Sequence, residues 1–355
     1  MTSAFMIINF ILNKLFRHNL NKICCISSVH NEERYLPGFL SHIRNYVDGF
    51  IFFNDRSNDK TSQILSSNNV IEIRHSIVNI SNNEYSSAIE VFRCGKWDKT
   101  LSSMAKEVID IIFSSGVANF ILPPPPSTSS TQFFFGTSCA GETHHNKADD
   151  CNHKYVSDKD QDPFSQQLLG NVLTEASQRC LYYNEKLVRQ FLVLFARKLG
   201  YKVALCCDAD ERFESNFLKN LHKISREITG KKICYGLHFR ELWGDSSHYR
   251  VDGVWGRKQK FILFPLIAGN YTFSQTMRHN IHTFWHPDQL HSLFCLPYNL
   301  YHLKMITEEE RIRRSKLYNS LDPNRKIQTI GYDYLIDTKS IELEPVKPEN
   351  YFNLQ

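Results

Sequence analysis

The stretch ALCCDADERF (204–213) joins a buried strand to a group of acidic residues. Residues 204–207 are small or apolar and predict a strand inside a sheet. Asp208, Asp210 and Glu211 follow at once. Because residues i and i+2 of an extended segment face the same way, Asp208 and Asp210 are expected to point together. Two carboxylates so placed repel each other unless a proton or a cation lies between them.

This pair of carboxylates predicts a divalent metal site. Mg²⁺ takes hard oxygen ligands and is commonly shared between carboxylates and substrate phosphates. In open α/β sheets, ligands bind beyond the carboxyl ends of strands, which is where Asp208 and Asp210 stand. A second acidic run, DKDQD (158–162), has the same spacing but does not follow a buried strand. The alternative for 208–210 is a solvated turn that stops the strand from extending.

The flanking sequence predicts an α/β fold. Strands are expected at 22–29, 49–55, 70–75, 201–207, 231–242 and 260–266. Helices are expected within 31–47, 60–67, 101–113, 184–200 and 215–228, and from about residue 307. Strands that alternate with helices indicate a mixed, mostly parallel sheet flanked by helices.

Three segments stand apart from this pattern. Residues 1–21 form an amphipathic segment, expected to pack on the domain or to rest on a membrane surface, because its apolar run is shorter than the ~20 residues that span a bilayer. Residues 114–165 contain PPPP and STSST and predict a long disordered insertion. Residues 341–355 are expected to form a C-terminal tail. The predicted domain is therefore 22–340, interrupted by the insertion.

The insertion also holds residues of the types that bind zinc. These are Cys139, His144, His145, Cys151 and His153. Their spacing matches no zinc-finger pattern, so a zinc-binding interaction module is a minor alternative for this segment.

Composition limits the partners and the compartment. The 355 residues are 42% hydrophobic and 22% charged, which allows a sizeable core. The net charge of +5 suits an anionic small ligand and does not require nucleic acid. Two pairs of adjacent cysteines lie in apolar runs, where neighbouring side chains point to opposite faces, so they are not natural disulfides. Buried free thiols predict a cytoplasmic protein, with the inner face of the membrane as a second location.

Two other predicted strands also end in polar residues. The strand 22–29 is followed by HNEE (30–33), and the strand 49–55 ends in Asp55, with Ser57 two residues later. Asp55 and Ser57 have the spacing that makes two side chains project together. A carboxylate there suits a ribose hydroxyl or a base N–H. Since carboxyl ends of parallel strands meet at one edge, all these residues are expected to line one crevice with Asp208.

In order and spacing, three segments resemble glycosyltransferase family 2. They are VHNEERYLPGFLSHI (29–43), FFNDRSNDKTSQIL (52–65) and NEKLVRQFLVLFARKLGYKVALCCDADERF (184–213). The resemblance covers about 22–113 and 180–340 and is to a bacterial-type subgroup. It implies the GT-A fold, the Rossmann-like fold of nucleotide-diphospho-sugar transferases.

The resemblance also implies roles for individual residues. The nucleoside pocket would be lined by His30, Asn31, Glu32 and Asp55, and Ser57, which projects together with Asp55, is a further candidate contact to the donor. Asp208 and Asp210 would hold Mg²⁺ or Mn²⁺ on the donor diphosphate, with His302 as a third metal ligand. Arg189 would either approach the same anion or lie on a solvated helix face.

The implied reaction is an inverting sugar transfer. The donor is a nucleoside-diphosphate sugar, and the acceptor is a hydroxyl of a glycan or lipid-linked precursor of surface polysaccharide or lipopolysaccharide. A carboxylate then acts as general base on the acceptor hydroxyl. The candidates are Glu241, Asp245 and Asp252, with Asp252 favoured. Trp243 and Trp255 are expected either to stack on sugar faces or to be core residues.

Two other functions fit parts of the sequence. A nucleotidyltransferase of the same fold would need a Gly-rich, basic phosphate loop after the first strand, and SSVHNEERY (27–35) has neither glycine nor lysine. A non-catalytic sugar-nucleotide binder would not need Asp55, Asp208 and Asp210 all to be intact. Both alternatives therefore rank below the transferase.

Overall fold

The computed structural model describes residues 22–81, 84–114, 133–135, 185–269, 285–321, 324–325 and 329–354. The N-terminal segment 1–21 and most of the insertion lie outside these ranges, and so do the Cys and His residues of the zinc alternative.

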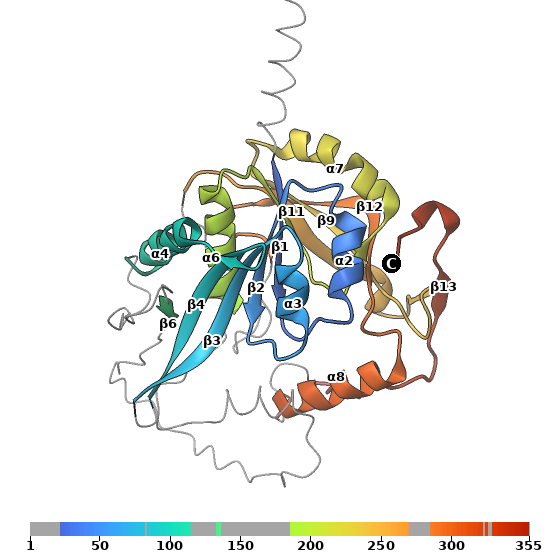
Figure 1. The fold of residues 1–355 in the computed structure, drawn as a ribbon. Helices are drawn as coiled ribbons and strands as arrows, with labels where there is room; N and C mark the ends of the chain where they lie inside the picture. The colour runs from blue at the N-terminus through green and yellow to red at the C-terminus, as the bar shows by residue number, and fades with distance from the viewer. Residues whose placement is uncertain are drawn as a thin grey trace, which may run out of the picture.

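A single large mixed sheet runs through the described part of the chain (Figure 1). Its strands, in spatial order, are β5-β4-β3-β2-β1-β7-β11-β9-β12-β8, and β6 pairs with β4. They are β1 (Ile23–Val29), β2 (Gly49–Asp55), β3 (Ile71–Ser81), β4 (Glu84–Arg93), β5 (Lys96–Trp97), β6 (Phe133–Phe135), β7 (Val203–Cys206), β8 (Glu211–Phe213), β9 (Ile233–Glu241), β11 (Gln259–Pro265) and β12 (Ser292–His302).

Parallel pairing is concentrated at the centre of this sheet. β3, β2, β1 and β7 are parallel to one another, and β9 is parallel to β12. β11 is antiparallel to both of its neighbours, β7 and β9. β1 and β7 are almost entirely buried, because a parallel sheet has helices over both faces. The predicted α/β fold with a mixed sheet is confirmed.

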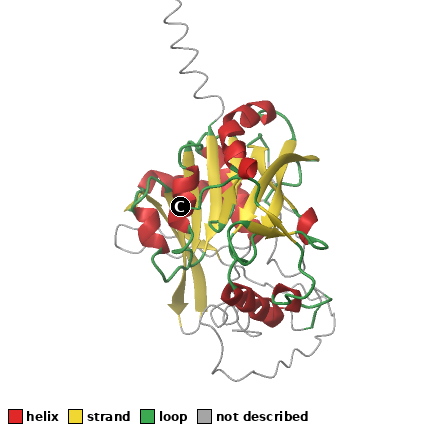
Figure 2. Cartoon of the chain, turned by 90° about the vertical axis from the view of Figure 1, so that its right-hand side faces the viewer, coloured by secondary structure: helices red, strands yellow, loops and turns green. Residues whose placement is uncertain are grey.

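Helices cover the sheet on both sides (Figure 2). They are α2 (Leu36–Ile43), α3 (Thr61–Ser66), α4 (Lys99–Ser114), α6 (Glu185–Lys198), α7 (Ser215–Ile228) and α8 (Glu308–Leu321). α2 and α3 contact each other, and α4 packs on α6 (Figure 1). α8 begins as predicted, with the N–H of Glu310 donating to Thr307 Oγ1 at 3.3 Å.

The cysteines of the central strands are free, as predicted. Cys24, Cys25, Cys206 and Cys207 are all buried and unbonded to another sulfur. Cys25 Sγ lies 3.7 Å from Cys207 Sγ, a contact between β1 and the turn after β7. These thiols fill the sheet interior as small apolar groups.

Residues near the C-terminus pack on the domain. β13 (Leu343–Pro345) pairs with β10 (His248–Arg250) in a second, two-stranded sheet. The buried Phe352 stacks on Tyr301 of β12 with ring centroids 4.4 Å apart. Residues 341–355, which were predicted to form a C-terminal tail, therefore contribute to the core through Phe352.

Among the described residues, no helix combines the length and the apolar character needed to cross a membrane.

Candidate functional site

The site lies where the connections of the sheet reverse direction. From β1 the chain proceeds through α2 to β2 on one side, whereas β7 lies on the other side of β1. In open α/β sheets, ligands bind beyond the carboxyl ends of the strands at such a point. The loop that begins at 30–32 leaves β1 there, and the turn 207–210 leaves β7 there.

The loops after β1 and β2 are tied together by hydrogen bonds. His30 Nδ1 lies 2.6 Å from the backbone oxygen of Asp55. The N–H of Asn31 donates to Ser57 Oγ at 3.0 Å. The structure thus brings together His30, Asn31, Asp55 and Ser57, four of the residues that the sequence predicted to contact the donor.

Asp55 itself belongs to a buried ion-pair group. Its carboxylate accepts hydrogen bonds from Arg56 Nε and Nη2 at 2.7 and 2.8 Å and lies 2.6 Å from His75 Nδ1. Burial would raise the pKa of Asp55, but Arg56 and His75 outweigh it and hold the pKa well below its usual range. Asp55 therefore has a structural role at the end of β2 that does not depend on a bound ligand.

Replacing Asp55 by asparagine is expected to lower the unfolding free energy by about 2–3 kcal/mol at pH 7, because Arg56 and His75 lose a buried anionic partner. The pKa of Asp55 is lower in the folded than in the unfolded protein, where it is about 3.9. Its contribution is thus present above that value and is lost as the pH falls through the folded pKa. In urea unfolding, the difference between wild type and D55N should therefore shrink below about pH 4.

Asp110→Asn, on the exposed face of α4, is the control for this prediction. It should change the unfolding free energy by no more than about 0.5 kcal/mol at any pH. A D55N deficit of equal size at pH 7 and pH 3 would contradict the role given to the Asp55 carboxylate.

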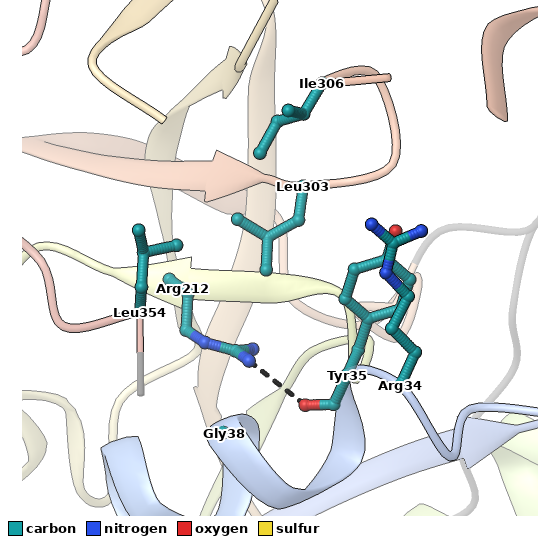
Figure 3. A pocket seen from close by; sticks show the side chains of 7 residues that line it. All are labelled: Arg34, Tyr35, Gly38, Arg212, Leu303, Ile306 and Leu354. Carbon is teal, nitrogen blue, oxygen red and sulfur yellow. Dashed lines mark hydrogen bonds between the residues drawn. The ribbon is translucent and has the colours of Figure 1, made fainter. Parts of the chain in front are cut away.

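Arg212 holds the acidic turn after β7 in shape. Its buried side chain donates from Nη1 to the backbone oxygens of Ala209 and Glu211, both at 2.9 Å. Nη2 donates to the backbone oxygen of Tyr35 at 3.0 Å (Figure 3). One guanidinium therefore fixes the turn after β7 against the loop after β1.

A cavity of about 350 Å³ opens beside Arg212 (Figure 3). It is lined by Arg34, Tyr35, Gly38, Arg212, Leu303, Ile306 and Leu354. Arg212 is the residue that the cavity shares with the acidic turn, whose carboxylates lie at the end of β7.

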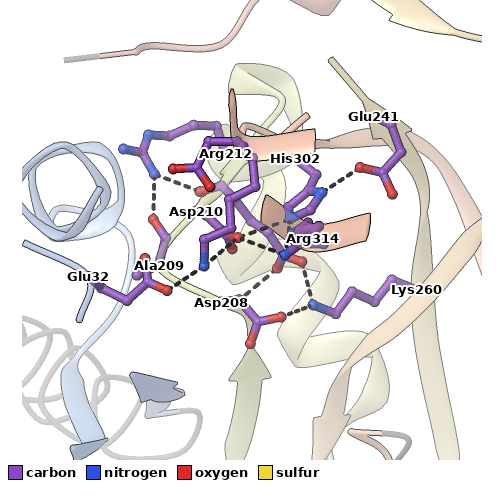
Figure 4. Close-up of polar contacts among 12 residues, drawn as sticks. Glu32, Asp208, Ala209, Asp210, Arg212, Glu241, Lys260, His302 and Arg314 are labelled. Atoms are coloured by element: carbon purple, nitrogen blue, oxygen red, sulfur yellow. Dashed lines mark hydrogen bonds and ion pairs between the residues drawn. The ribbon is translucent and has the colours of Figure 1, made fainter. Parts of the chain in front are cut away.

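Those carboxylates form a compact cluster (Figure 4). Asp208, Asp210 and Glu211 each offer an oxygen within 4.8 Å of the others. Asp210 is only 2% exposed, and its Oδ1 has no hydrogen-bond partner among the described residues. The same holds for Oε2 of the buried Glu32, in the loop after β1. Buried oxygens without partners are costly, so this donor set fits a hard cation such as Mg²⁺ or Mn²⁺.

Lys260 of β11 contacts two of the three clustered carboxylates. Its Nζ lies 2.7 Å from Asp208 Oδ2 and also contacts Glu211 Oε1. An antiparallel strand begins where its neighbour ends, and the pairing of Leu263 with Leu205 brings Lys260 opposite Asp208. Lys260 therefore lies at the site because β11 pairs antiparallel with β7 in this mixed sheet.

Lys304, just after β12, contacts Asp210, the third clustered carboxylate, and also Glu32 of the loop after β1. Its Nζ lies 2.5 Å from Glu32 Oε1 and 3.2 Å from Asp210 Oδ2. Arg314 of α8 adds a further positive charge, with Nη2 3.8 Å from Asp210 Oδ2. Lys304 therefore links the loop after β1 to the turn after β7.

His302, the predicted third metal ligand, lies beside Asp210. Its Nε2 is 2.9 Å from Asp210 Oδ2, and its Nδ1 contacts Glu241 Oε2. Glu241 also binds Lys258 Nζ at 2.9 Å. Burial would lower the pKa of His302, but Glu241 and Asp210 outweigh it and raise the pKa to about 9. Both ring nitrogens of His302 contact carboxylates, so His302 orients Asp210 in this structure. The third residue of the candidate metal cluster is Glu211 instead of His302.

The carboxylates of the site differ in proton affinity. Burial raises the pKa of Glu32 and that of Glu211 to about 7, against the opposing charges of Lys304 and Lys260. Burial acts on Asp210 as well, but Lys304 and His302 outweigh it and hold its pKa well below the usual range. Asp210 is therefore the member of the cluster that stays anionic most firmly.

Arg189 of α6 is buried rather than on a solvated helix face. Its guanidinium lies 4.2 Å from the ring centroid of Trp285. Burial raises the pKa of Asp208, Lys260 lowers it and Asp210 raises it, and the charge of Arg189 adds a smaller lowering effect, with a lowered pKa as the net result. Arg189 thus acts electrostatically on the predicted anion site.

Asp252, the favoured base candidate, is paired with Arg250. Asp252 accepts from Arg250 Nε and Nη2 at 2.7 and 2.9 Å. The Arg250 guanidinium lies 4.6 and 4.8 Å from the ring centroids of Trp243 and Trp255. Both tryptophans are buried in a small second core, so the core interpretation holds for them.

Asp245 is the exposed candidate, with 55% of its side chain accessible. It lies in a turn, 3.0 Å from His248 Nδ1. The N–H of the preceding Gly244 donates to the backbone oxygen of Ile306 at 3.1 Å. The turn that carries Asp245 is therefore tied to Ile306, one of the residues that line the cavity.

The sequence reasoning missed the lysines of the site. Lys258 and Lys260 are two residues apart at the start of an otherwise apolar strand, and His302 and Lys304 have the same spacing. Because side chains alternate between the two faces of a strand, the two members of each pair are predicted to point to the same face. Pairs of polar residues two positions apart, at either end of an apolar run, were thus the sequence feature that could have predicted these lysines as site residues.

No protein-family model matches the chain, and no curated protein matches it. The chemistry of the site is therefore the basis for assigning a function.

Proposed function

We propose that the protein is a metal-dependent glycosyltransferase with a GT-A fold. It transfers a sugar from a nucleoside-diphosphate sugar to a hydroxyl of a glycan or lipid-linked acceptor. The cytoplasmic location, with contact at the inner face of the membrane, is part of the same proposal.

One observation carries this proposal. A buried Asp210 oxygen without a partner among the described residues lies in a carboxylate cluster at the reversal point of an open α/β sheet. Hard cations bind such oxygens and commonly complete their coordination with substrate phosphates. The resemblance of the three sequence segments to glycosyltransferase family 2 supports the choice of a nucleotide sugar as that substrate.

Each part of the site has a task in such a transfer. Asp208, Asp210 and Glu211 would hold Mg²⁺ or Mn²⁺, which stabilises the departing diphosphate when bound. Lys260 and Lys304 place two further positive charges there. The loops carrying His30, Asn31, Asp55 and Ser57 would hold the nucleoside.

The general base would be one of the three candidate carboxylates. Each has a partner: Glu241 contacts Lys258, Asp252 contacts Arg250, and Asp245 lies 3.0 Å from His248 Nδ1. Asp245 is the most exposed of the three, with 55% of its side chain accessible. We assign the general base to Asp245 in preference to Asp252 because an acceptor hydroxyl could reach it most readily.

A thermal-shift screen tests the donor class. Nucleoside-diphosphate sugars, each with Mn²⁺, should include at least one that raises the melting temperature of the wild type. The same compound should have little effect on D210N. A panel that stabilises neither protein, or both equally, argues against the proposal. Stabilisation without any sugar transfer would instead indicate a non-catalytic binder.

A further inference from the structure

Each carboxylate around the candidate metal position is already in contact with an ammonium group. Lys260 contacts Asp208 (Figure 4) and Glu211, and Lys304 contacts Asp210 and Glu32. Both lysine side chains are largely buried, at 20% and 17% exposed. Each Nζ therefore lies between two carboxylates, a setting that favours the charged ammonium form of lysine.

Lys260 and a divalent cation would compete for the same two carboxylates. The ammonium occupies Asp208 Oδ2 and Glu211 Oε1, which belong to two of the three residues of the metal cluster. Asp208 and Glu211 are joined further by the Asp208 N–H, which donates to Glu211 Oε2 at 2.9 Å. A metal ion bound to both carboxylates would lie within a few ångströms of the ammonium, and the repulsion between the two cations favours displacement of the ammonium.

We infer that Lys260 is an exchangeable internal counter-cation, which lowers the affinity of the site for a divalent ion until a diphosphate is bound. The inference rests on the proposed function, because it assumes the metal site. The incoming diphosphate offers the displaced ammonium new oxygen partners within the same site. Binding of metal and of diphosphate then favour each other, and by linkage the effect is equal in both directions.

Direct measurement of Mn²⁺ binding tests this inference without any donor or acceptor. Free Mn²⁺ is titrated against the protein and followed by electron paramagnetic resonance, for wild type, Lys260→Met and Lys258→Met. K260M should bind Mn²⁺ at least about tenfold more tightly than wild type, because its two carboxylates are no longer occupied. K258M removes the same charge two residues away, where the partner is Glu241, and should stay within about threefold of wild type.

The possible results separate the inference from the proposed function. Equal Mn²⁺ affinity of wild type and K260M overturns the role of Lys260 but leaves the metal site standing. Absence of Mn²⁺ binding to all three proteins overturns the metal site itself. If K260M does not fold, a second experiment replaces the K260M titration. The rate at which an amine-acylating reagent modifies Lys260 of the wild type is measured by mass spectrometry of the peptides. This rate should rise about tenfold at Mn²⁺ concentrations that the titration shows to be saturating, and an unchanged rate contradicts the inference.

Discussion

Replacing Asp210 by asparagine should lower metal-dependent sugar transfer by about a thousandfold or more. The substitution keeps the shape of the side chain but removes the charge that Lys304, His302 and the proposed metal ion share. Loss of roughly 4 kcal/mol of transition-state stabilisation corresponds to a factor of about a thousand in rate, which is the size expected for a displaced metal ion. Release of the nucleoside diphosphate, with Mn²⁺ saturating, measures the effect.

Asp110→Asn is the matched control, since Asp110 lies exposed on α4. It should keep wild-type activity. Circular dichroism of D210N should match that of wild type, so that the loss reports chemistry and not unfolding. A folded D210N with more than about a tenth of wild-type activity would exclude Asp210 as a metal ligand.

Replacing Arg212 by methionine should destabilise the protein by roughly 3 kcal/mol. Three backbone oxygens, those of Tyr35, Ala209 and Glu211, would lose their charged donor in a buried setting. Methionine fills a similar volume, so the change isolates the lost hydrogen bonds from a cavity effect. Urea unfolding measures the difference in free energy.

Arg34→Met is the control, because Arg34 also lines the cavity but its side chain is exposed. The Arg34 side chain is 61% exposed, so its loss should cost no more than about 0.5 kcal/mol. Lysine at position 212 should rescue only part of the stability, because an ammonium lacks the planar fork that reaches several acceptors at once. An R212M protein as stable as R34M would contradict the role of Arg212.

Local sequence patterns were sufficient for most of the central fold. The apolar runs at 22–29 and 49–55 became β1 and β2, and the residues after them gathered as expected. The run 70–75 became the longer strand β3, which continues antiparallel into β4. That hairpin was missed because residues 76–93 carry polar and apolar residues without the clean alternation of a half-buried strand.

The candidate site was harder to predict because its cations come from distant strands. Asp208 and Asp210 are visible from one short motif, but Lys260 reaches them only through antiparallel pairing of β11 with β7. β12 was not predicted as a strand, so nothing in the sequence placed His302 next to Glu241. Pairing between distant strands depends on tertiary packing, which periodicity within one segment does not report.

The glycosyltransferase proposal is tested most directly by the dependence of nucleoside-diphosphate release on a divalent cation. The donor that the thermal-shift screen identifies is incubated with wild-type protein in excess chelator, and Mn²⁺ is then restored. The proposal predicts no release above background with chelator, full release after Mn²⁺, and none from D210N under either condition. Release that persists in excess chelator, or that is the same in D210N as in wild type, would contradict it.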